Sequence, residues 1–378
     1  MKIKVLFLIE SLAGGGAEKV LSVILSHLDN KRFEIRVCAI VDAGVHREAV
    51  RACVARYTSI INYNGGTVGR TFNRLKYKLV YSLLPPSWVY RLFVPKNNDV
   101  EVAFCEGFVT KLLSHANSKA RQLAWVHTDL AAHPWPLKQG IYRNKEEERL
   151  VYQRFDKVVC VSRAVEDVMQ KDYGLTNTTV IHNPVDAEEI SALSREECPV
   201  PLDSSCFNIV AVGRLVPEKG FDELVRITAD MTARQSNVHL YIIGDGPERT
   251  RLEEMIEAGQ SRMSIHLTGY RANPYALMSR ADLYVCSSHA EGFSLTIAEA
   301  MVLGVPIISM NCAGPAELLE KGRFGALCNT YNDLSDTLRK AVTNKAFLAN
   351  LRNQSKEGKN RFYSDVPLKR IEALLETV

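Results

Sequence analysis

The sequence lacks several features that would assign the protein to particular structural classes. Its nine cysteines form no C-x-x-C pair and no short paired spacing, which argues against a disulfide framework and is typical of reduced thiols. No apolar run approaches the 18 residues of a membrane span, and the run that follows Met1 is too short for a signal peptide. We therefore expect a cytoplasmic protein.

Acidic residues are missing from one long segment. Residues 49–98 contain no Asp or Glu, but they contain eight Lys and Arg residues interleaved with aromatic residues. This pattern fits a surface for an anionic membrane, and it fits equally an insertion whose aromatics complete the core. Nucleic acid is disfavoured as a partner, because no nucleic-acid-binding module is recognisable elsewhere. The bases expected on the membrane or acceptor side are Arg70, Arg74, Lys76 and Lys78.

The remaining composition is that of an ordinary globular protein. With 378 residues, of which 46% are hydrophobic and 24% charged, the chain is long enough for two or three domains with real cores. The net charge of +4 hides an asymmetry, since residues 1–187 carry a net +8 and residues 188–378 a net −4. Opposite signs in the two halves favour two domains with different partners.

The first half alternates strand-like and helical segments. Such alternation predicts a parallel Rossmann-like sheet, whose ligands bind at the carboxyl ends of the strands. Patterns of buried strands occur at residues 2–12, 34–41, 59–63, 100–105, 122–127, 157–162 and 180–182.

Two features of this half are candidate ligand contacts. The turn Gly14-Gly15-Gly16 lies between a strand and a helical pattern, so its backbone N–H groups can bind a phosphate. A dinucleotide site is an alternative, because Asp42 follows the second strand, but the third glycine of the G-x-G-x-x-G fingerprint is missing. His127 ends another predicted strand and would face the ligand cleft, although a lone histidine there is more often structural.

A proline-containing segment, residues 188–206, is expected to be a linker. After it, the alternation of strands and helices begins again. We therefore expect a second Rossmann-like domain, with the binding site in a cleft between the two. Its predicted strands are residues 208–213, 238–244, 265–268, 283–286, 306–309 and 326–328.

Three loops of the second half leave the carboxyl ends of predicted strands. Arg214 and Lys219 follow the first strand and together can hold a diphosphate. Gly244 begins a tight turn after the second strand, where turn chemistry alone is an equal explanation. Tyr270 and Arg271 follow the third strand, where they could contact a nucleobase.

The segment of residues 286–304 organises the rest of the site. Glu291 lies in the loop between a strand and a helix predicted over residues 293–303, and Glu299 lies inside that helix. The start of a helix attracts an anion, and the two carboxylates are about two turns apart. The spacing therefore suits one carboxylate at each end of an anionic ligand. Taken singly, each is more often a capping or solvated residue.

In this order, the glycine turn, the Gly213–Gly220 segment, Gly244-Asp245-Gly246-Pro247 and the Glu291–Glu299 pair resemble the retaining glycosyltransferases of family 4, which have the GT-B architecture. The resemblance covers nearly the whole chain. It implies an α/β protein in which two Rossmann-like domains, residues 1–187 and 207–363, face each other across a cleft. It further implies that a C-terminal helix, residues 364–378, packs back onto the first domain.

The resemblance also implies a role for each candidate residue. Arg214 and Lys219 would hold the donor diphosphate, Glu299 the ribose hydroxyls, and Glu291 the donor sugar near its reacting face. Other donor contacts would come from the N–H groups of Phe293, Ser294 and Leu295, from Gly15 and Gly16, and from Gly244. Tyr270 and Arg271 would lie beside the base, and His127 would line the sugar or acceptor site.

The implied reaction moves a sugar from a nucleoside diphosphate to an acceptor hydroxyl with retention of configuration. A UDP-sugar is the expected donor. The leaving diphosphate needs charge stabilisation, which Lys, Arg and a helix N-terminus supply without a metal. The D-x-D metal motif is absent, and no His, Cys and carboxylate cluster has metal-binding spacing. We therefore expect no metal and no other cofactor.

The acceptor side depends on the basic segment. Positive charge would hold the enzyme at the inner face of a membrane, which suggests a lipid-linked saccharide acceptor, as in capsule, exopolysaccharide or lipopolysaccharide assembly. Other classes stay open. A glycoside hydrolase would leave the diphosphate contacts without purpose. A sugar-nucleotide epimerase or phosphorylase shares the architecture, and a non-catalytic carbohydrate-binding relative is disfavoured by the intact set of motifs.

Overall fold

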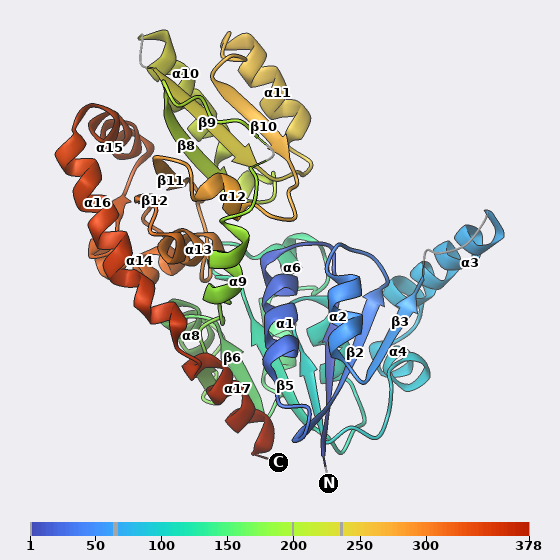
Figure 1. Ribbon diagram of the computed structural model, residues 1–378. Coiled ribbons are helices and arrows are strands. Elements are labelled where there is room, and N and C mark those ends of the chain that lie inside the picture. The colour runs from blue at the N-terminus through green and yellow to red at the C-terminus, as the bar shows by residue number, and fades with distance from the viewer. Residues whose placement is uncertain (1, 63–66, 199, 235–236, 378) are drawn as a thin grey trace. The chain divides into compact units, whose positions relative to one another are not determined.

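The computed structural model describes residues 2–62, 67–198, 200–234 and 237–377; the side chains of residues 67–72 lie outside this description. The chain forms two compact units, Met1–Pro184 with Asp365–Val378, and Val185–Ser364. In each unit, helices cover the faces of a parallel sheet (Figure 1). Among the described helices, none combines the length and the hydrophobicity that a membrane crossing requires.

The first unit is built on a seven-stranded sheet. Its order is β3-β2-β1-β4-β5-β6-β7, and all neighbouring strands are parallel. A strand is present at each of the seven places predicted for this half, although the seventh overlaps its prediction only at Val180 and Tyr63 at the end of the third lies outside the described residues. The strands are β1 Ile3–Ile9, β2 Phe33–Val41, β3 Arg56–Ile61, β4 Val100–Ala103, β5 Arg121–Val126, β6 Lys157–Cys160 and β7 Thr178–Val180.

Both faces of this sheet are covered, because Val5–Ile9 of the central strand β1 are all buried. The helix predicted after the glycine turn buries Val20, Leu21, Ile24 and Leu25 against it. The helices of the unit are α1 Gly16–His27, α2 Arg47–Cys53, α3 Thr67–Lys78, a π-helical turn Leu79–Leu83, α4 Pro86–Phe93, α5 Phe108–Ser114, α6 Trp135–Lys138, α7 Lys145–Tyr152, α8 Arg163–Lys171 and α17 Val366–Glu376.

Helix α17 is formed by the C-terminal residues and contacts the first unit. Ile371 and Leu375 are fully buried. Arg32 Nη1 forms an ion pair with Glu372 Oε2 at 2.6 Å, and Arg121 Nη1 donates to the carbonyl oxygen of Leu374 at 2.6 Å. The C-terminal segment thus belongs to the first unit, although it follows the second along the chain.

The second unit is built on a six-stranded parallel sheet of order β10-β9-β8-β11-β12-β13. All six predicted strands are present, as β8 Phe207–Val212, β9 Val238–Ile243, β10 Ile265–Gly269, β11 Leu283–Cys286, β12 Ile307–Met310 and β13 Ala326–Cys328. Its helices are α9 Ala187–Leu193, α10 Phe221–Ala233, α11 Arg249–Ala258, α12 Tyr275–Met278, α13 Leu295–Leu303, α14 Ala313–Leu318, α15 Tyr331–Thr343 and α16 Lys345–Gly358, with 3-10 turns Pro217–Lys219, Glu320–Gly322 and Lys359–Tyr363.

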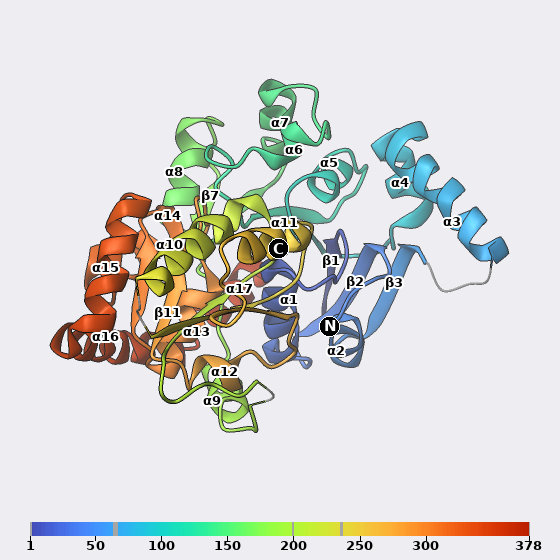
Figure 2. The same ribbon diagram turned by 90° about the horizontal axis from the view of Figure 1, so that it is seen from above.

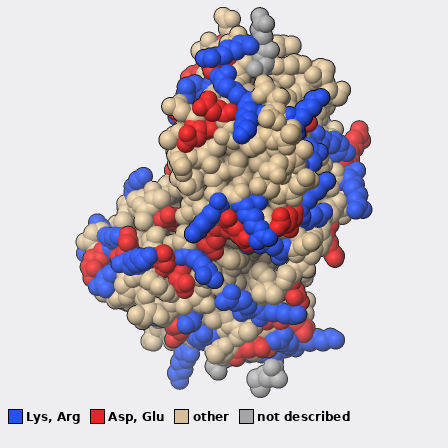
Figure 3. All heavy atoms as spheres, turned by 90° about the vertical axis from the view of Figure 1, so that its left-hand side faces the viewer, with Lys and Arg blue, Asp and Glu red and all other residues tan. Residues whose placement is uncertain are grey.

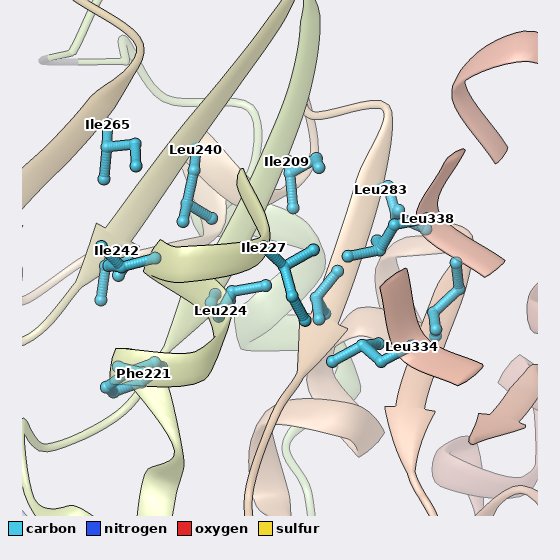
Figure 4. Packing of buried hydrophobic residues seen from close by; sticks show 14 of the residues in the cluster. Ile209, Phe221, Leu224, Ile227, Leu240, Ile242, Ile265, Leu283, Leu334 and Leu338 are labelled. Carbon is cyan, nitrogen blue, oxygen red and sulfur yellow. The ribbon is translucent and has the colours of Figure 1, made fainter. Parts of the chain in front are cut away.

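One face of this sheet carries the core of the second unit. Alternate strand residues, among them Ile209, Leu240 and Ile265, pack against the buried sides of α10 and α15 (Figure 4). Leu224 comes from α10 and Leu334 from α15, and both are fully buried. This packing holds the strands in a rigid order, so the loops that leave them have fixed positions.

The division of the chain differs from the predicted one. Residues 188–206 were expected to be a linker, but part of this segment forms α9, which packs against α12 and α13. Asn273 Nδ2 donates to the carbonyl oxygen of Leu193 at 2.9 Å, and Arg280 Nη2 to that of Glu196 at 2.8 Å. The segment is therefore part of the second unit, which begins at Val185.

Surface charge is locally balanced on the face shown in Figure 3, where basic and acidic side chains lie next to one another. The ion pair between Arg323 and Glu357, at 2.5 Å, is an exposed pair of this kind. Such exposed pairs contribute little to stability. In composition, residues 49–98 differ from this mixture, because they contain bases and no acids.

Candidate active site

The carboxyl edge of the six-stranded sheet brings most of the predicted donor-binding residues together. The strand order reverses between β8 and β11, and ligands of parallel sheets bind at such a reversal. Lys219 lies in the loop after β8, and Glu291 lies in the loop after β11. The two loops on either side of this point thus carry the most strongly predicted charged residues of the unit.

Lys219 and Glu291 form an ion pair that joins these two loops. Lys219 Nζ lies 2.5 Å from Glu291 Oε1, and Ser288 donates its hydroxyl proton to the same oxygen at 2.8 Å. Burial acts to lower the pKa of Lys219, but the adjacent Glu291 carboxylate outweighs it, and the pKa is raised. The lysine is therefore a fixed positive charge at neutral pH.

Further hydrogen bonds hold the Glu291 loop against the Lys219 loop. Ser287 Oγ donates to the carbonyl oxygen of Lys219 at 2.8 Å, and the N–H of His289 donates to that of Glu218 at 2.9 Å. The Tyr331 hydroxyl donates to the carbonyl oxygen of Ser287 at 2.8 Å. Ser287, Ser288 and Tyr331 were missed from the sequence, because serines carry no distinctive pattern and Tyr331 is distant along the chain.

Gly220 is required by this close approach of the two loops. Its φ of +61° lies in the left-handed region, and a Cβ there would collide with the carbonyl oxygen of Ser287. The glycine in the Lys219-Gly220 pair thus has a structural role, which is to let the two charged loops meet.

The start of α13 is built to receive a ligand. The helix was predicted from residue 293 but begins at Leu295, so Phe293 and Ser294 lie in the loop before it. Ser294 is buried with a φ of +65°, which is strained for a residue with a side chain. Its Oγ is a buried polar atom without a hydrogen-bond partner in the described structure. Buried polar atoms are normally paired, so this hydroxyl has hydrogen-bonding capacity that a ligand could use.

Glu299 is also buried, with 3% of its surface exposed, whereas a glutamate in mid-helix is usually solvated. The Tyr275 hydroxyl donates to Glu299 Oε1 at 3.2 Å. Burying a carboxylate is costly unless its oxygens accept hydrogen bonds. Its position therefore favours a functional role over the solvated alternative.

The other residues predicted to bind the sugar donor differ in their exposure and in their contacts. Arg214 and Tyr270 have exposed side chains in the loops after β8 and β10. Arg271 has a buried Nε atom that finds no partner in the described structure. Gly244 lies where the loop after β9 packs on Gly213, and its N–H donates to the carbonyl oxygen of Gly269 at 3.0 Å. These contacts explain Gly244 structurally, and a donor contact there stays a prediction.

In the first unit, the glycine turn lies after β1, also at the carboxyl edge of its sheet. Gly15 precedes α1, and Gly16 is the first residue of that helix. The end of the Glu18 side chain folds back against Gly15. The turn thus presents the backbone at the start of a helix, as the predicted phosphate contact needs.

His127 follows β5, and its ring is held in one tautomer. Nε2 lies 3.0 Å from the carbonyl oxygen of Phe104, which can only accept, so Nε2 carries the proton and Nδ1 keeps its lone pair. Burial lowers the pKa of His127 to about 4. The ring is therefore neutral at pH 7 and offers an acceptor nitrogen.

Glu106 was missed from the sequence and holds the main chain at His127. Its Oε1 accepts the N–H of His127 at 2.5 Å and that of Thr128 at 2.6 Å. The side chain is 4% exposed, and burial raises the pKa of Glu106 to about 7. Glu106 directly follows a predicted strand, and residues at the carboxyl ends of parallel strands face the ligand site, which is how His127 was identified. The sequence therefore contained a signal for Glu106.

The basic segment contains the end of α2, β3, α3, the π-helical turn and α4, and α3 extends beyond the β3 edge of the sheet (Figures 1 and 2). Helix α4 instead packs against α5, and its Tyr90 hydroxyl donates to Glu101 of β4 at 2.8 Å. Of the eleven exposed large hydrophobic side chains described, five are in this segment: Leu75, Tyr77, Leu83, Trp88 and Leu92. Arg74 and Lys78 are exposed, Lys76 is half-buried over the Phe93 ring, and the Arg70 side chain is outside the description. Only some of the aromatics complete the core.

Comparison with protein families gives two matches that together span most of the chain. Residues 14–189 match the model of Glycosyltransferase Family 4, and residues 201–360 match that of Glycosyl transferases group 1. The two ranges correspond to the two compact units. They also contain all of the predicted site residues.

Individual relatives have low sequence identity to this chain. The chain is 29% identical to the 2-deoxystreptamine N-acetyl-D-glucosaminyltransferase of Niallia circulans over 39% of each protein. It is 23% identical to the poly(ribitol-phosphate) alpha-N-acetylglucosaminyltransferase of Staphylococcus aureus, over 80% of this chain and 61% of that one. The matches thus cover less than two thirds of the length of these relatives.

Solved structures share the whole fold. The Anabaena protein HepE, in complex with UDP and glucose, superposes with a TM-score of 0.77 and 21% identity over all of both chains. The Staphylococcus aureus protein TarM gives a TM-score of 0.73 with 14% identity, over all of this chain and 99% of that one. The predicted α/β architecture is therefore confirmed, and the chain belongs to the family of group 1, family 4 glycosyltransferases.

Proposed function

We propose that the protein transfers a sugar from a nucleoside-diphosphate sugar to an acceptor hydroxyl, with retention of configuration and without a metal or other cofactor. The observation that carries this proposal is the Lys219–Glu291 pair at the point of strand reversal, beside the start of α13. A positive charge, a helix N-terminus and a carboxylate lie together where a diphosphate sugar would bind.

The residues have distinct tasks in this reaction. Lys219 and Arg214, with the start of α13, stabilise the negative charge that develops on the leaving diphosphate. Glu291 orients the donor sugar. The bond from the anomeric carbon to the diphosphate oxygen breaks, the acceptor oxygen bonds to that carbon on the same face, and the acceptor proton passes to the departing diphosphate.

The nucleoside is proposed to be held by the buried groups of the second unit. Glu299 would accept hydrogen bonds from the ribose hydroxyls, while Ser294 Oγ and Arg271 Nε have unmet hydrogen-bonding capacity. A structural relative was solved with UDP and glucose, which supports UDP-sugars as the first donors to test.

The acceptor is proposed to be a lipid-linked saccharide of a cell-surface polymer, bound at the inner face of a membrane. Relatives named for poly(ribitol-phosphate) and for lipopolysaccharide core synthesis support a surface polymer. Exposed Trp88, Leu83 and Leu92 beside exposed Arg74 and Lys78 support contact with an anionic membrane.

A thermal-shift screen tests the donor. UDP-, GDP- and ADP-sugars are compared with and without EDTA, on wild type and on Glu299→Ala. We expect one nucleotide class to raise Tm, with the same rise in EDTA, since a ligand stabilises the state that it binds. Losing one charge-assisted hydrogen bond should weaken binding at least about tenfold in Glu299→Ala.

The exposed Glu253→Ala serves as the matched control and should keep the full response. An assay of the reaction products then separates a sugar transferase from the alternative enzyme classes. An epimerase or phosphorylase would convert the sugar nucleotide without an acceptor, and a hydrolase would act on saccharides that carry no nucleotide. A response to no nucleotide, or one equal in Glu299→Ala, would contradict the proposal.

Liposome sedimentation at low salt tests the membrane contact. Replacing both Arg74 and Lys78 by glutamine should weaken binding to anionic vesicles about 30-fold, because each base near the surface contributes about 1 kcal/mol. Arg143 and Lys171, exposed bases of the same unit outside this segment, give the matched double glutamine control. Equal losses in the two double variants, or no binding of wild type, would count against the membrane contact.

A further inference from the structure

A group of side chains that could bind a metal ion lies at the amino edge of the six-stranded sheet, opposite the edge that carries the donor residues. Asp203, Cys206 and His239 each offer one ligand atom, and these atoms lie within 4.8 Å of one another. Among the residues that the structure describes, this is the one such group. It differs from the expectation of no metal-binding cluster, because His239 is distant from the other two along the chain and no sequence spacing reveals it.

The strand register places Asn208, His239, Tyr241 and His266 on one face of the sheet. Asn208 of β8 pairs with His239 of β9, and Tyr241 of β9 pairs with His266 of β10. Alternation places all four on the face opposite the core that contains Ile209. The turn that carries Asp203 and Cys206 directly precedes β8 and therefore meets this face.

Hydrogen bonds fix the turn that carries Asp203 and Cys206. Asn208 Nδ2 donates to the carbonyl oxygens of Asp203 at 2.9 Å and of Cys206 at 3.0 Å. Ser205 donates its N–H and its hydroxyl to Asp203 Oδ1, at 2.8 and 2.6 Å. Such outer contacts orient a ligand, and they leave Asp203 Oδ2 facing Cys206 Sγ at 3.3 Å.

A further possible donor, His266, lies beside His239. His266 Nε2 is 3.4 Å from His239 Nδ1, and the two rings are 5.2 Å apart between centroids. Bonds of about 2.0–2.3 Å at a tetrahedral zinc ion imply separations of roughly 3.3–3.8 Å between donors. The His239–His266 and Asp203–Cys206 separations thus already match edges of a tetrahedron.

We propose that Asp203, Cys206 and His239, with His266 as the fourth ligand, bind a zinc ion. A thiolate with imidazoles selects zinc and similar late transition metals over magnesium or calcium. Binding breaks the S–H bond of Cys206, forms the bond from sulfur to the metal, and releases the proton to solvent. The ion joins the turn before β8 to β9 and β10. It stands apart from sugar transfer, because the donor residues lie at the other ends of these strands.

Cobalt titration of the full-length protein, after treatment with a chelator, tests this site. We expect a thiolate-to-cobalt charge-transfer absorption that saturates at one ion per chain and disappears when zinc is added. Cys206→Ser should lose this absorption, and His239→Gln should weaken cobalt binding at least about tenfold. Cys198→Ser is the matched control, because that thiol instead donates to the carbonyl oxygen of Val200 at 3.0 Å.

Several outcomes would overturn the proposal. These are no absorption from folded wild type, an absorption that persists in Cys206→Ser, or one that is lost in Cys198→Ser. Circular dichroism establishes that each variant is folded. EDTA should lower Tm in wild type but not in Cys206→Ser, while any rise in Tm caused by a nucleotide is the same in both. The metal site and the donor site are therefore tested separately.

Discussion

Replacing Lys219 by alanine is expected to lower kcat of sugar transfer by about 10²–10³-fold, the usual loss when one fixed electrostatic contact to a developing negative charge is removed. The lysine is held by Glu291 at 2.5 Å, so its charge lies in place before the diphosphate begins to leave. Initial rates of UDP release with a saturating acceptor measure this change.

A variant of the ion-pair partner Glu291 and a control variant at another lysine test whether the effect is specific to Lys219. Glu291→Gln keeps the shape of the side chain, so we expect a similar loss in kcat with nucleotide affinity nearly unchanged, whereas Lys219→Ala should weaken both. Lys345→Ala removes an exposed lysine of the same unit and should leave the rate as in wild type. A rate loss below tenfold in Lys219→Ala would remove the lysine from the proposed mechanism.

Glu106→Gln is expected to become more stable relative to wild type as the pH rises from 5 to 8. The native pKa of Glu106, about 7, lies above its ordinary value of 4.5, so the folded protein keeps a proton that the unfolded chain releases. Raising the pH through this window therefore favours unfolding, by about 3 kcal/mol. Glutamine imitates the protonated carboxyl and still accepts from the N–H groups of His127 and Thr128.

Urea unfolding at pH 5, 6, 7 and 8 measures this difference. The free energy of unfolding of wild type should fall relative to that of Glu106→Gln as the pH rises. Glu48→Gln, which removes an exposed carboxylate of the same unit, should follow wild type. Parallel curves for wild type and Glu106→Gln would show that Glu106 is already ionised in the folded protein at pH 5.

Much of the fold followed from local patterns. The thirteen strands of the described residues were all predicted, at least in part, because buried parallel strands are short apolar runs whose pattern is visible within a few residues. The order of the glycine turn, the Lys219 loop and the Glu291–Glu299 segment was likewise enough to indicate the family. These signals are local, so they survive without knowledge of what packs against them.

Helix α9 shows where local patterns were insufficient. Residues 188–206 have the composition of a linker, but Leu193 and Glu196 find hydrogen-bond donors in Asn273 and Arg280. Because those donors come from distant segments, composition could not predict that the segment would belong to the second unit.

The sequence by itself determined the class of the fold, the family and the candidate residues Lys219, Glu291 and Glu299. Only the tertiary structure decided which side chains meet: Lys219 with Glu291, Glu106 with the main chain at His127, and Cys206 with His239. The physical reason is that strand order and register set these contacts, together with the burial that alters protonation. Both arise from packing between residues that are far apart along the chain.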